Sequence, residues 1–230
     1  MPQVLERVSE QVLERMPEQV LAKMPEQDLE GTSEQETAPP TRNRIRITRK
    51  MCDALADNGL LTGRYELIDG EVISKMGQKP VHATVIRRLN ALLIRIFGER
   101  FVGVQLPIEL EGTDRETNEP EPDLVVSVGD ADDYSLRHPL PHEVVLLVEV
   151  ADTSLAFDLK VKSLLYAKAG IADYWVVDAK GRRLVVHRKP SGEGYLEIFA
   201  YSEEESLSPL ARPDASVRVS DLMPPEIETE

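Results

Sequence analysis

An acidic residue interrupts the most apolar segment of this chain, and that interruption strongly constrains the fold. Residues 144–150 read VVLLVEV, so Glu149 lies in a β-branched run with the length of a buried strand. A second acid, Asp123, follows Pro122 and opens the apolar run LVV at 124–126. An ionised carboxylate costs several kcal/mol to move out of water unless a cation or hydrogen bonds compensate. The two acids therefore predict a metal site, a salt bridge or a raised pKa.

Neighbouring strands would allow Asp123 and Glu149 to converge on one point. Carboxylate oxygens with waters are ligands that suit Mg²⁺ or Mn²⁺ rather than zinc. The 4 histidines of the chain show no mutual spacing typical of a zinc site. Each acid also has an ordinary interpretation, because Asp123 could cap the start of a strand and Glu149 could pair with a buried arginine.

The apolar pattern predicts an α/β domain with a mixed sheet flanked by helices. Alternating runs around 69–70, Asp-Gly, are typical of a two-residue hairpin turn. A helix of about 17 residues follows Pro80, with His82 in its first turn and Gly98 at its end. Residues 101–110 are predicted to form a strand. The element order αββαβββαβββ has connections too short for a doubly wound fold.

A further helix is predicted from residue 158 to 169, ending at Gly170. Its apolar residues Val161, Leu164 and Leu165 are expected to face the sheet, because buried helix faces are apolar. The YWVV run that follows predicts another buried strand.

Lys162 in this helix could complete a hydrolytic site. In metal-dependent phosphodiester hydrolysis, carboxylates hold the ion, the ion lowers the pKa of water, and a nearby lysine stabilises negative charge. The position two residues after Glu149, where a compact acid-x-lysine motif has its lysine, holds Ala151. Lys162 could supply the ammonium from a different backbone position, although it could also be a surface lysine and Lys160 competes for the role.

Composition divides the chain into three parts. Residues 1–41 contain the octapeptides VLERVSEQ, VLERMPEQ, VLAKMPEQ and DLEGTSEQ, whose period and prolines oppose one continuous helix. We interpret them as an acidic arm, disordered or weakly helical, with binding of a protein partner as the alternative. Residues 42–202 form the predicted domain, and residues 203–230 are expected to be an acidic tail.

The net charge of −14 is concentrated at the two ends of the chain. Residues 1–41 and 201–230 carry −6 each, which leaves the central part nearly neutral. A strongly acidic chain is a poor nonspecific binder of nucleic acid, but the neutral centre weakens that objection. With no apolar stretch of about 18 residues and a single cysteine, the sequence predicts a cytoplasmic protein without membrane contact.

Several segments together carry a family resemblance. They are YELIDGE at 65–71, His82, PDL at 122–124, Glu149-Val150, Asp158-xxx-Lys162-xxx-Tyr166 and AGIADYWVVD at 169–178. As a set, over about residues 45–200, they resemble the Uma-two family of putative restriction endonucleases, within the PD-(D/E)xK nuclease superfamily. The resemblance implies a restriction-endonuclease-like fold and Mg²⁺-dependent cleavage of a DNA substrate, with the lysine moved to the helix.

The resemblance also implies roles for particular residues. Asp123, Glu149 and Lys162 would be catalytic, with the two acids binding Mg²⁺ or Mn²⁺, and Glu66 and His82 would be accessory catalytic residues. The expected function is a metal-dependent endonuclease that hydrolyses DNA phosphodiester bonds. A catalytically inactive module that binds a protein partner, and an acidic mimic of nucleic acid, are the alternatives. Formation of a homodimer stays open.

Overall fold

The computed structural model describes residues 45–75, 77 and 79–225. The predicted octapeptide arm lies outside this part of the chain. The described residues form the α-helices α4 (Arg49–Asp57), α5 (Pro80–Phe97), α6 (Asp114–Thr117), α7 (Leu155–Phe157) and α8 (Ser163–Lys168). Its strands are β1 (Tyr65–Ile68), β2 (Glu71–Ser74), β3 (Val102–Val104), β4 (Leu124–Ser127), β5 (Val144–Ala151), β6 (Asp173–Asp178), β7 (Arg183–Ser191), β8 (Gly194–Ser202), β9 (Ser206–Leu207) and β10 (Val217–Arg218).

Six strands form one mixed sheet in the order β3-β4-β5-β6-β7-β8. Neighbours in the sheet are antiparallel except β5 and β6, which are parallel. A parallel pair needs a crossover connection, and here α7, a π-helical turn at Asp158–Lys162 and α8 provide it. The predicted mixed sheet is confirmed, and its crossover helix starts just after the strand that contains Glu149.

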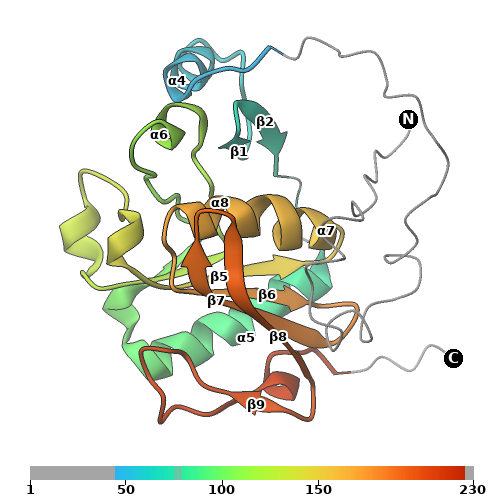
Figure 1. Cartoon of the computed structure of the whole chain (residues 1–230). Coiled ribbons are helices and arrows are strands. Elements are labelled where there is room, and N and C mark those ends of the chain that lie inside the picture. The colour runs from blue at the N-terminus through green and yellow to red at the C-terminus, as the bar shows by residue number, and fades with distance from the viewer. Residues whose placement is uncertain (1–44, 76, 78, 226–230) are drawn as a thin grey trace, which may run out of the picture.

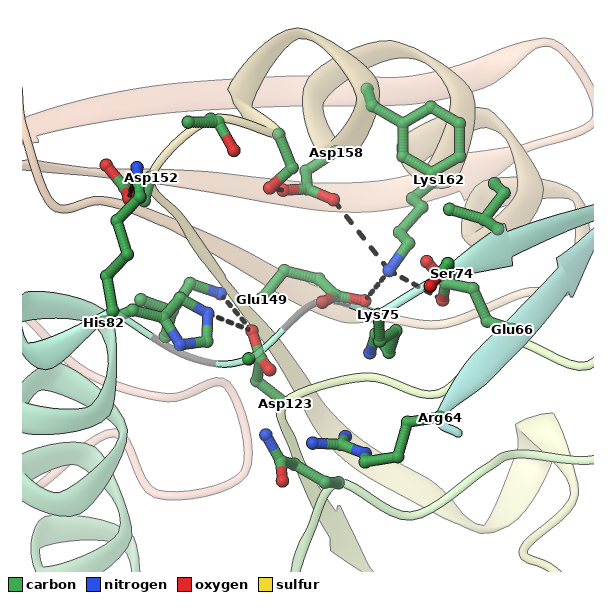
Figure 2. A pocket seen from close by; sticks show the side chains of 18 residues that line it. Arg64, Glu66, Ser74, Lys75, His82, Asp123, Glu149, Asp152, Asp158 and Lys162 are labelled. Carbon is green, nitrogen blue, oxygen red and sulfur yellow. Dashed lines mark hydrogen bonds and ion pairs between the residues drawn. The ribbon is translucent and has the colours of Figure 1, made fainter. Parts of the chain in front are cut away.

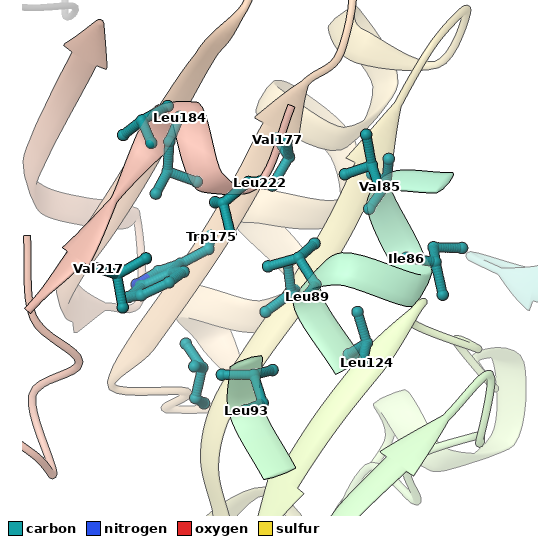
Figure 3. Packing of buried hydrophobic residues seen from close by; sticks show 14 of the residues in the cluster. Val85, Ile86, Leu89, Leu93, Leu124, Trp175, Val177, Leu184, Val217 and Leu222 are labelled. Atoms are coloured by element: carbon teal, nitrogen blue, oxygen red, sulfur yellow. The ribbon is translucent and has the colours of Figure 1, made fainter. Parts of the chain in front are cut away.

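Helices cover both faces of the sheet, with α8 above it and α5 below it in Figure 1. The face toward α5 carries a core that includes Leu89, Leu93 and Trp175, all fully buried (Figure 3). The face toward α8 carries a second core around Tyr166 and Tyr174. No helix of the described ranges is both long and apolar enough to span a membrane.

The C-terminal segment belongs to the domain core, which corrects the boundary expected at residue 203. Leu207, Val217, Leu222 and Met223 are buried in the cluster beneath the sheet, where Val217 and Leu222 lie near the indole ring of the core (Figure 3). Burying one aliphatic side chain contributes about 1.5 to 3 kcal/mol. These scattered apolar residues therefore anchor a segment whose acidic composition suggested a loose tail.

The predicted hairpin is confirmed, and its turn shows why Asp-Gly stands there. Strands β1 and β2 pair antiparallel, and the two turn residues Asp69 and Gly70 have φ of 49° and 75°. Positive φ at both central residues defines the turn whose twist matches a two-residue hairpin. The strand predicted over 101–110 is shorter than expected, because β3 ends before Gln105, whose φ is 53°.

The crossover helix forms where predicted, but of the three apolar residues expected to face the sheet only Leu165 packs against the core. Val161 and Leu164 are 41% and 38% exposed, whereas Asp158 and Lys162 are each 2% exposed. Two charged groups can be buried together when ion pairs and hydrogen bonds offset their desolvation. The helix therefore turns its polar residues inward and leaves two aliphatic residues partly in water.

His187 is a buried base in the core on the α8 side of the sheet. It lies opposite Tyr174 in the β6–β7 register, and its ring contacts those of Tyr174 and Tyr195. Burial lowers the pKa of His187 to about 3, since desolvation disfavours the charged ring, while a hydrogen bond with the Tyr174 backbone opposes the shift.

This burial predicts an acid-sensitive contribution to stability. Above the ordinary histidine pKa, both the folded and the unfolded state hold a neutral His187, so the contribution is fully present. As pH falls from about 6.5 toward 3, only the unfolded state binds the proton, and up to about 1.4 kcal/mol is lost per pH unit. The variant His187→Phe should remove this part of the slope in urea denaturation between pH 7 and 4. The control is His142→Gln, which replaces an exposed histidine and should keep the wild-type slope. An unchanged slope in His187→Phe would contradict the assignment.

Candidate active site

Adjacent strands bring Asp123 and Glu149 to one cavity. Strands β4 and β5 are antiparallel with Leu124 opposite Val148, so Asp123 and Glu149 are the next pair in this register. Asp123 lies just before β4, and its Oδ2 accepts a 2.8 Å hydrogen bond from the backbone N–H of Val150. Both side chains line a cavity of about 450 Å³ (Figure 2).

Lys162 reaches the same cavity from the crossover helix and lies among carboxylates. Its Nζ is 2.9 Å from Oε1 of Glu149, 2.9 Å from Oε2 of Glu66 and 3.9 Å from Oδ1 of Asp158. Its side chain is only 3% exposed. Hydrogen-bonded ion pairs of this kind are what a buried ammonium needs to remain charged, and Figure 2 shows them converging on one nitrogen.

Glu66 enters the site from outside the central sheet. It lies on β1, and the hairpin is held against the loop before β4 by backbone hydrogen bonds in both directions between Leu67 and Glu119. The backbone N–H of Glu121 donates to Glu66 Oε2 at 3.3 Å. The hairpin therefore places a third carboxylate on Lys162.

His82 approaches Asp123 from α5, on the side of the cavity opposite Glu66 (Figure 2). Pro80 starts α5 and places His82 in its first turn, with Nε2 at 3.4 Å from Oδ2 of Asp123. The other ring nitrogen, Nδ1, is buried without a hydrogen-bond partner in the described part of the chain. The five residues that the sequence predicted for the site thus meet in one cavity.

Two further side chains belong to the site, although the sequence analysis gave them no role. Asp158 lines the cavity and accepts a 2.6 Å hydrogen bond from Ser154 Oγ through Oδ2. Tyr166 donates its hydroxyl to Oε1 of Glu149 at 3.0 Å. The signal was the four-residue spacing of Asp158, Lys162 and Tyr166, which places all three on one helix face.

Burial opposes ionisation of the carboxylates around Lys162, and their mutual repulsion adds to this effect. Burial raises the pKa of Glu149 to about 8; Lys162 opposes this shift, while Asp123 and Asp158 add to it. Burial also raises the pKa of Asp158 to about 6, against the charge of Lys162. Although burial disfavours a charged lysine, the attraction of Glu149, Asp158 and Glu66 raises the pKa of Lys162. The lysine therefore stays charged, and Glu149 is a weaker acid than an exposed glutamate.

Asp123 is held in the ionised form despite its burial. Burial alone would raise its pKa, but the hydrogen bond and charge of His82, the charge of Lys75 and the N–H of Val150 lower it. The two central acids therefore differ, because the pKa of Asp123 lies below its usual value and that of Glu149 lies above it. Groups whose surroundings move their pKa values apart are typical of active sites.

Two oxygens of the central acids are left for a ligand. Within the described residues, no hydrogen bond involves Oδ1 of Asp123 or Oε2 of Glu149. No group of three or more His, Cys, Asp or Glu side chains in residues 45–75 and 79–225 has the geometry of a metal site. Mg²⁺ commonly binds to one or two carboxylates and keeps several waters. The two acids therefore fit Mg²⁺ or Mn²⁺ but not a site made entirely of protein ligands.

Three further basic side chains line the cavity, those of Arg64, Lys75 and Lys79. Arg64 and Lys75 both interact with Glu121, and Lys79 lies 2.8 Å from Asp152. Arg64 and Lys79 are largely exposed, whereas Lys75 is mostly buried.

A comparison with known families assigns the chain to one of them. The sequence profile of the Uma2 family, described as "Putative restriction endonuclease", matches residues 60–220. The chain belongs to this family. The match extends beyond residue 203, in agreement with the packing of the C-terminal segment. No curated protein matches the sequence.

A solved structure shares the fold of this Uma2 protein. It is the crystal structure of a putative nuclease belonging to DUF820 from Anabaena variabilis ATCC 29413. The two are 16% identical with a TM-score of 0.57, and the match covers 73% of this chain and 96% of the other. The restriction-endonuclease-like fold is therefore confirmed.

The raised pKa of Glu149 predicts that Glu149→Gln is more stable than the wild type at alkaline pH. Below about pH 4.5 the acid is protonated in both states and contributes no difference. Between about 4.5 and 8 only the unfolded state loses the proton, so the wild type loses stability, on the order of a few kcal/mol, that the amide retains. Urea denaturation at pH 5 and pH 8.5 should show the gap opening in favour of the variant.

The control is Glu193→Gln, which replaces an exposed glutamate and should have the same free energy of unfolding as the wild type at both pH values. A constant difference between Glu149→Gln and the wild type would mean that Glu149 is ionised in the folded protein at both pH values.

Proposed function

We propose that this Uma2 protein is an endonuclease that hydrolyses DNA phosphodiester bonds with Mg²⁺ or Mn²⁺. The observation that carries the proposal is the convergence of Asp123, Glu149 and the charged Lys162 in one cavity. Two acids with free oxygens and a buried ammonium are the components that hydrolysis of a phosphodiester requires.

The two acids would hold the ion through Asp123 Oδ1 and Glu149 Oε2. When bound, the ion would lower the pKa of a water molecule and neutralise phosphate charge. Binding a cation requires ionised ligands, so Glu149 gives up its proton, and Lys162 stabilises the resulting carboxylate through Oε1. His82 keeps Asp123 charged and fixes its orientation.

Lys162 would also stabilise the negative charge that develops on the attacked phosphate. A preorganised donor in a site that excludes water is effective because it does not reorganise during the reaction. Its other partners, Glu66 and Asp158, hold the flexible lysine stem in place. Their role is to position the ammonium rather than to contact the substrate.

The cations of the cavity support a phosphate-containing substrate. Arg64, Lys75 and Lys79 line the cavity together with its carboxylates, and the exposed side chains of Arg64 and Lys79 can meet a polyanion from solvent. The acidic character of the whole chain arises largely from its two ends. A nearly neutral central part with local cations is compatible with DNA binding that weakens as salt concentration rises.

Substitution of Lys162 by methionine should reduce cleavage of supercoiled plasmid at saturating Mn²⁺ by roughly 100-fold or more, the loss typical of one stabilising donor. Methionine keeps the aliphatic stem but removes the charge. Lys168→Met provides the matched control, because Lys168 is an exposed residue of α8 and should leave the rate unchanged. Equal losses in the two variants would exclude a specific role for Lys162.

Substitution of Asp123 by asparagine should abolish saturable Mn²⁺ binding in titration calorimetry, because it removes the charged ligand while keeping the side-chain volume. Asp152→Asn is the control; this acid borders the same cavity but is paired with Lys79 and Lys180. It should bind Mn²⁺ like the wild type. A wild-type protein without a saturable Mn²⁺ site and without cleavage would instead support the catalytically inactive module.

A further inference from the structure

Glu149 receives both of its side-chain hydrogen bonds on the same oxygen. Lys162 Nζ donates to Oε1 at 2.9 Å, and the hydroxyl of Tyr166 donates to the same atom at 3.0 Å. Tyr166 is fully buried. In Figure 2 the bonded oxygen of Glu149 faces Lys162, while the other lies on the side toward Asp123. The two donors therefore determine which way the carboxylate faces.

Lys162 alone defines this orientation poorly. Its ammonium has three rotatable donors on a flexible stem and is shared with Glu66 and Asp158. Tyr166 is different because its ring is rigid and fixed by packing. It contacts the ring of Tyr174 edge to face, with centroids 5.0 Å apart.

A comparison of three tyrosine hydroxyls shows how this contact differs from an ordinary hydrogen bond to the backbone; Tyr166 and Tyr174 are fully buried, and Tyr195 is partly buried. Tyr174 donates to the backbone carbonyl of Asp158 at 3.0 Å, and Tyr195 donates to the backbone carbonyl of Ile171 at 2.9 Å. Of the three hydroxyls, only that of Tyr166 is bonded to a side chain of the site. All three satisfy a buried polar group, but only Tyr166 also acts on a carboxylate that has another oxygen available.

We propose that Tyr166 is a positioning residue for the hydrolytic reaction. By holding Oε1 of Glu149, it keeps Oε2 directed at the point where Asp123 also presents an oxygen, so that the two acids can bind one divalent cation. This inference rests on the proposed function. Partners that orient a metal ligand typically contribute 10-fold to 100-fold to metal affinity or activity.

The test compares Tyr166→Phe with Tyr174→Phe. Each variant removes one hydroxyl from a fully buried ring, and the two rings touch, so both variants should lose a comparable amount of stability in urea denaturation. Mn²⁺ affinity is measured by titration calorimetry without DNA, and kcat and KM are measured with plasmid DNA. Tyr166→Phe should weaken Mn²⁺ binding by 10-fold to 100-fold and lower kcat, while KM for DNA stays within about twofold.

Tyr174→Phe should retain the wild-type Mn²⁺ affinity and kcat. Equal values in the two variants would overturn the positioning role while leaving the nuclease proposal intact, because wild-type cleavage and Mn²⁺ binding are measured in the same series. A rise in KM with unchanged kcat would also overturn it, since that pattern reports substrate binding. A wild type that neither binds Mn²⁺ nor cleaves DNA would overturn both proposals.

Discussion

The buried ion-pair cluster around Lys162 is the interaction on which the rest of the site depends. One ammonium contacts Glu149 and Glu66 at 2.9 Å, and Asp158 lies slightly farther away. Removing the ammonium from this cluster would leave buried carboxylates without their cation, which is far more costly than losing a surface pair. The lysine therefore connects the sheet, the crossover helix and the β1–β2 hairpin, because each of them contributes one of its partners.

The crossover helix is arranged around this cluster rather than around its own apolar residues. A face made of Asp158, Lys162 and Tyr166 is buried, and Val161 and Leu164 remain partly exposed. The π-helical turn lies at the two charged residues, and such turns are frequent at functional sites. Burial, with smaller contributions from Asp123 and Asp158, raises the pKa of Glu149 within this cluster.

The acidity of the whole chain says little about the charges at its cavity. The net charge of −14 arises mostly from the two ends, and part of the C-terminal end folds back under the sheet through Leu207, Val217 and Leu222. At the cavity, Arg64, Lys75 and Lys79 lie among the carboxylates. Overall charge is therefore a weak guide to what this site binds, because electrostatic interactions in water are screened beyond about 10 Å.

The sequence by itself determined the elements whose patterns are local. The hairpin followed from Asp69-Gly70, the long helix α5 from its apolar period between Pro80 and Gly98, and the meeting of Asp123 with Glu149 from acids placed in apolar strands. In each case the pattern that predicted the element lay within a single segment, or within two segments of strand length.

Only the tertiary structure decided which face of the crossover helix is buried, that the C-terminal segment completes the core, and that Tyr166 donates to the same oxygen as Lys162. Hydrophobic periodicity predicts a buried apolar face, and it fails where opposite charges from distant segments compensate one another. The free energy of burying Lys162 depends on Glu149, on the preceding strand, and on Glu66, which lies far away in the sequence. No local pattern contains that information, because the compensating charges become neighbours only when the chain has folded.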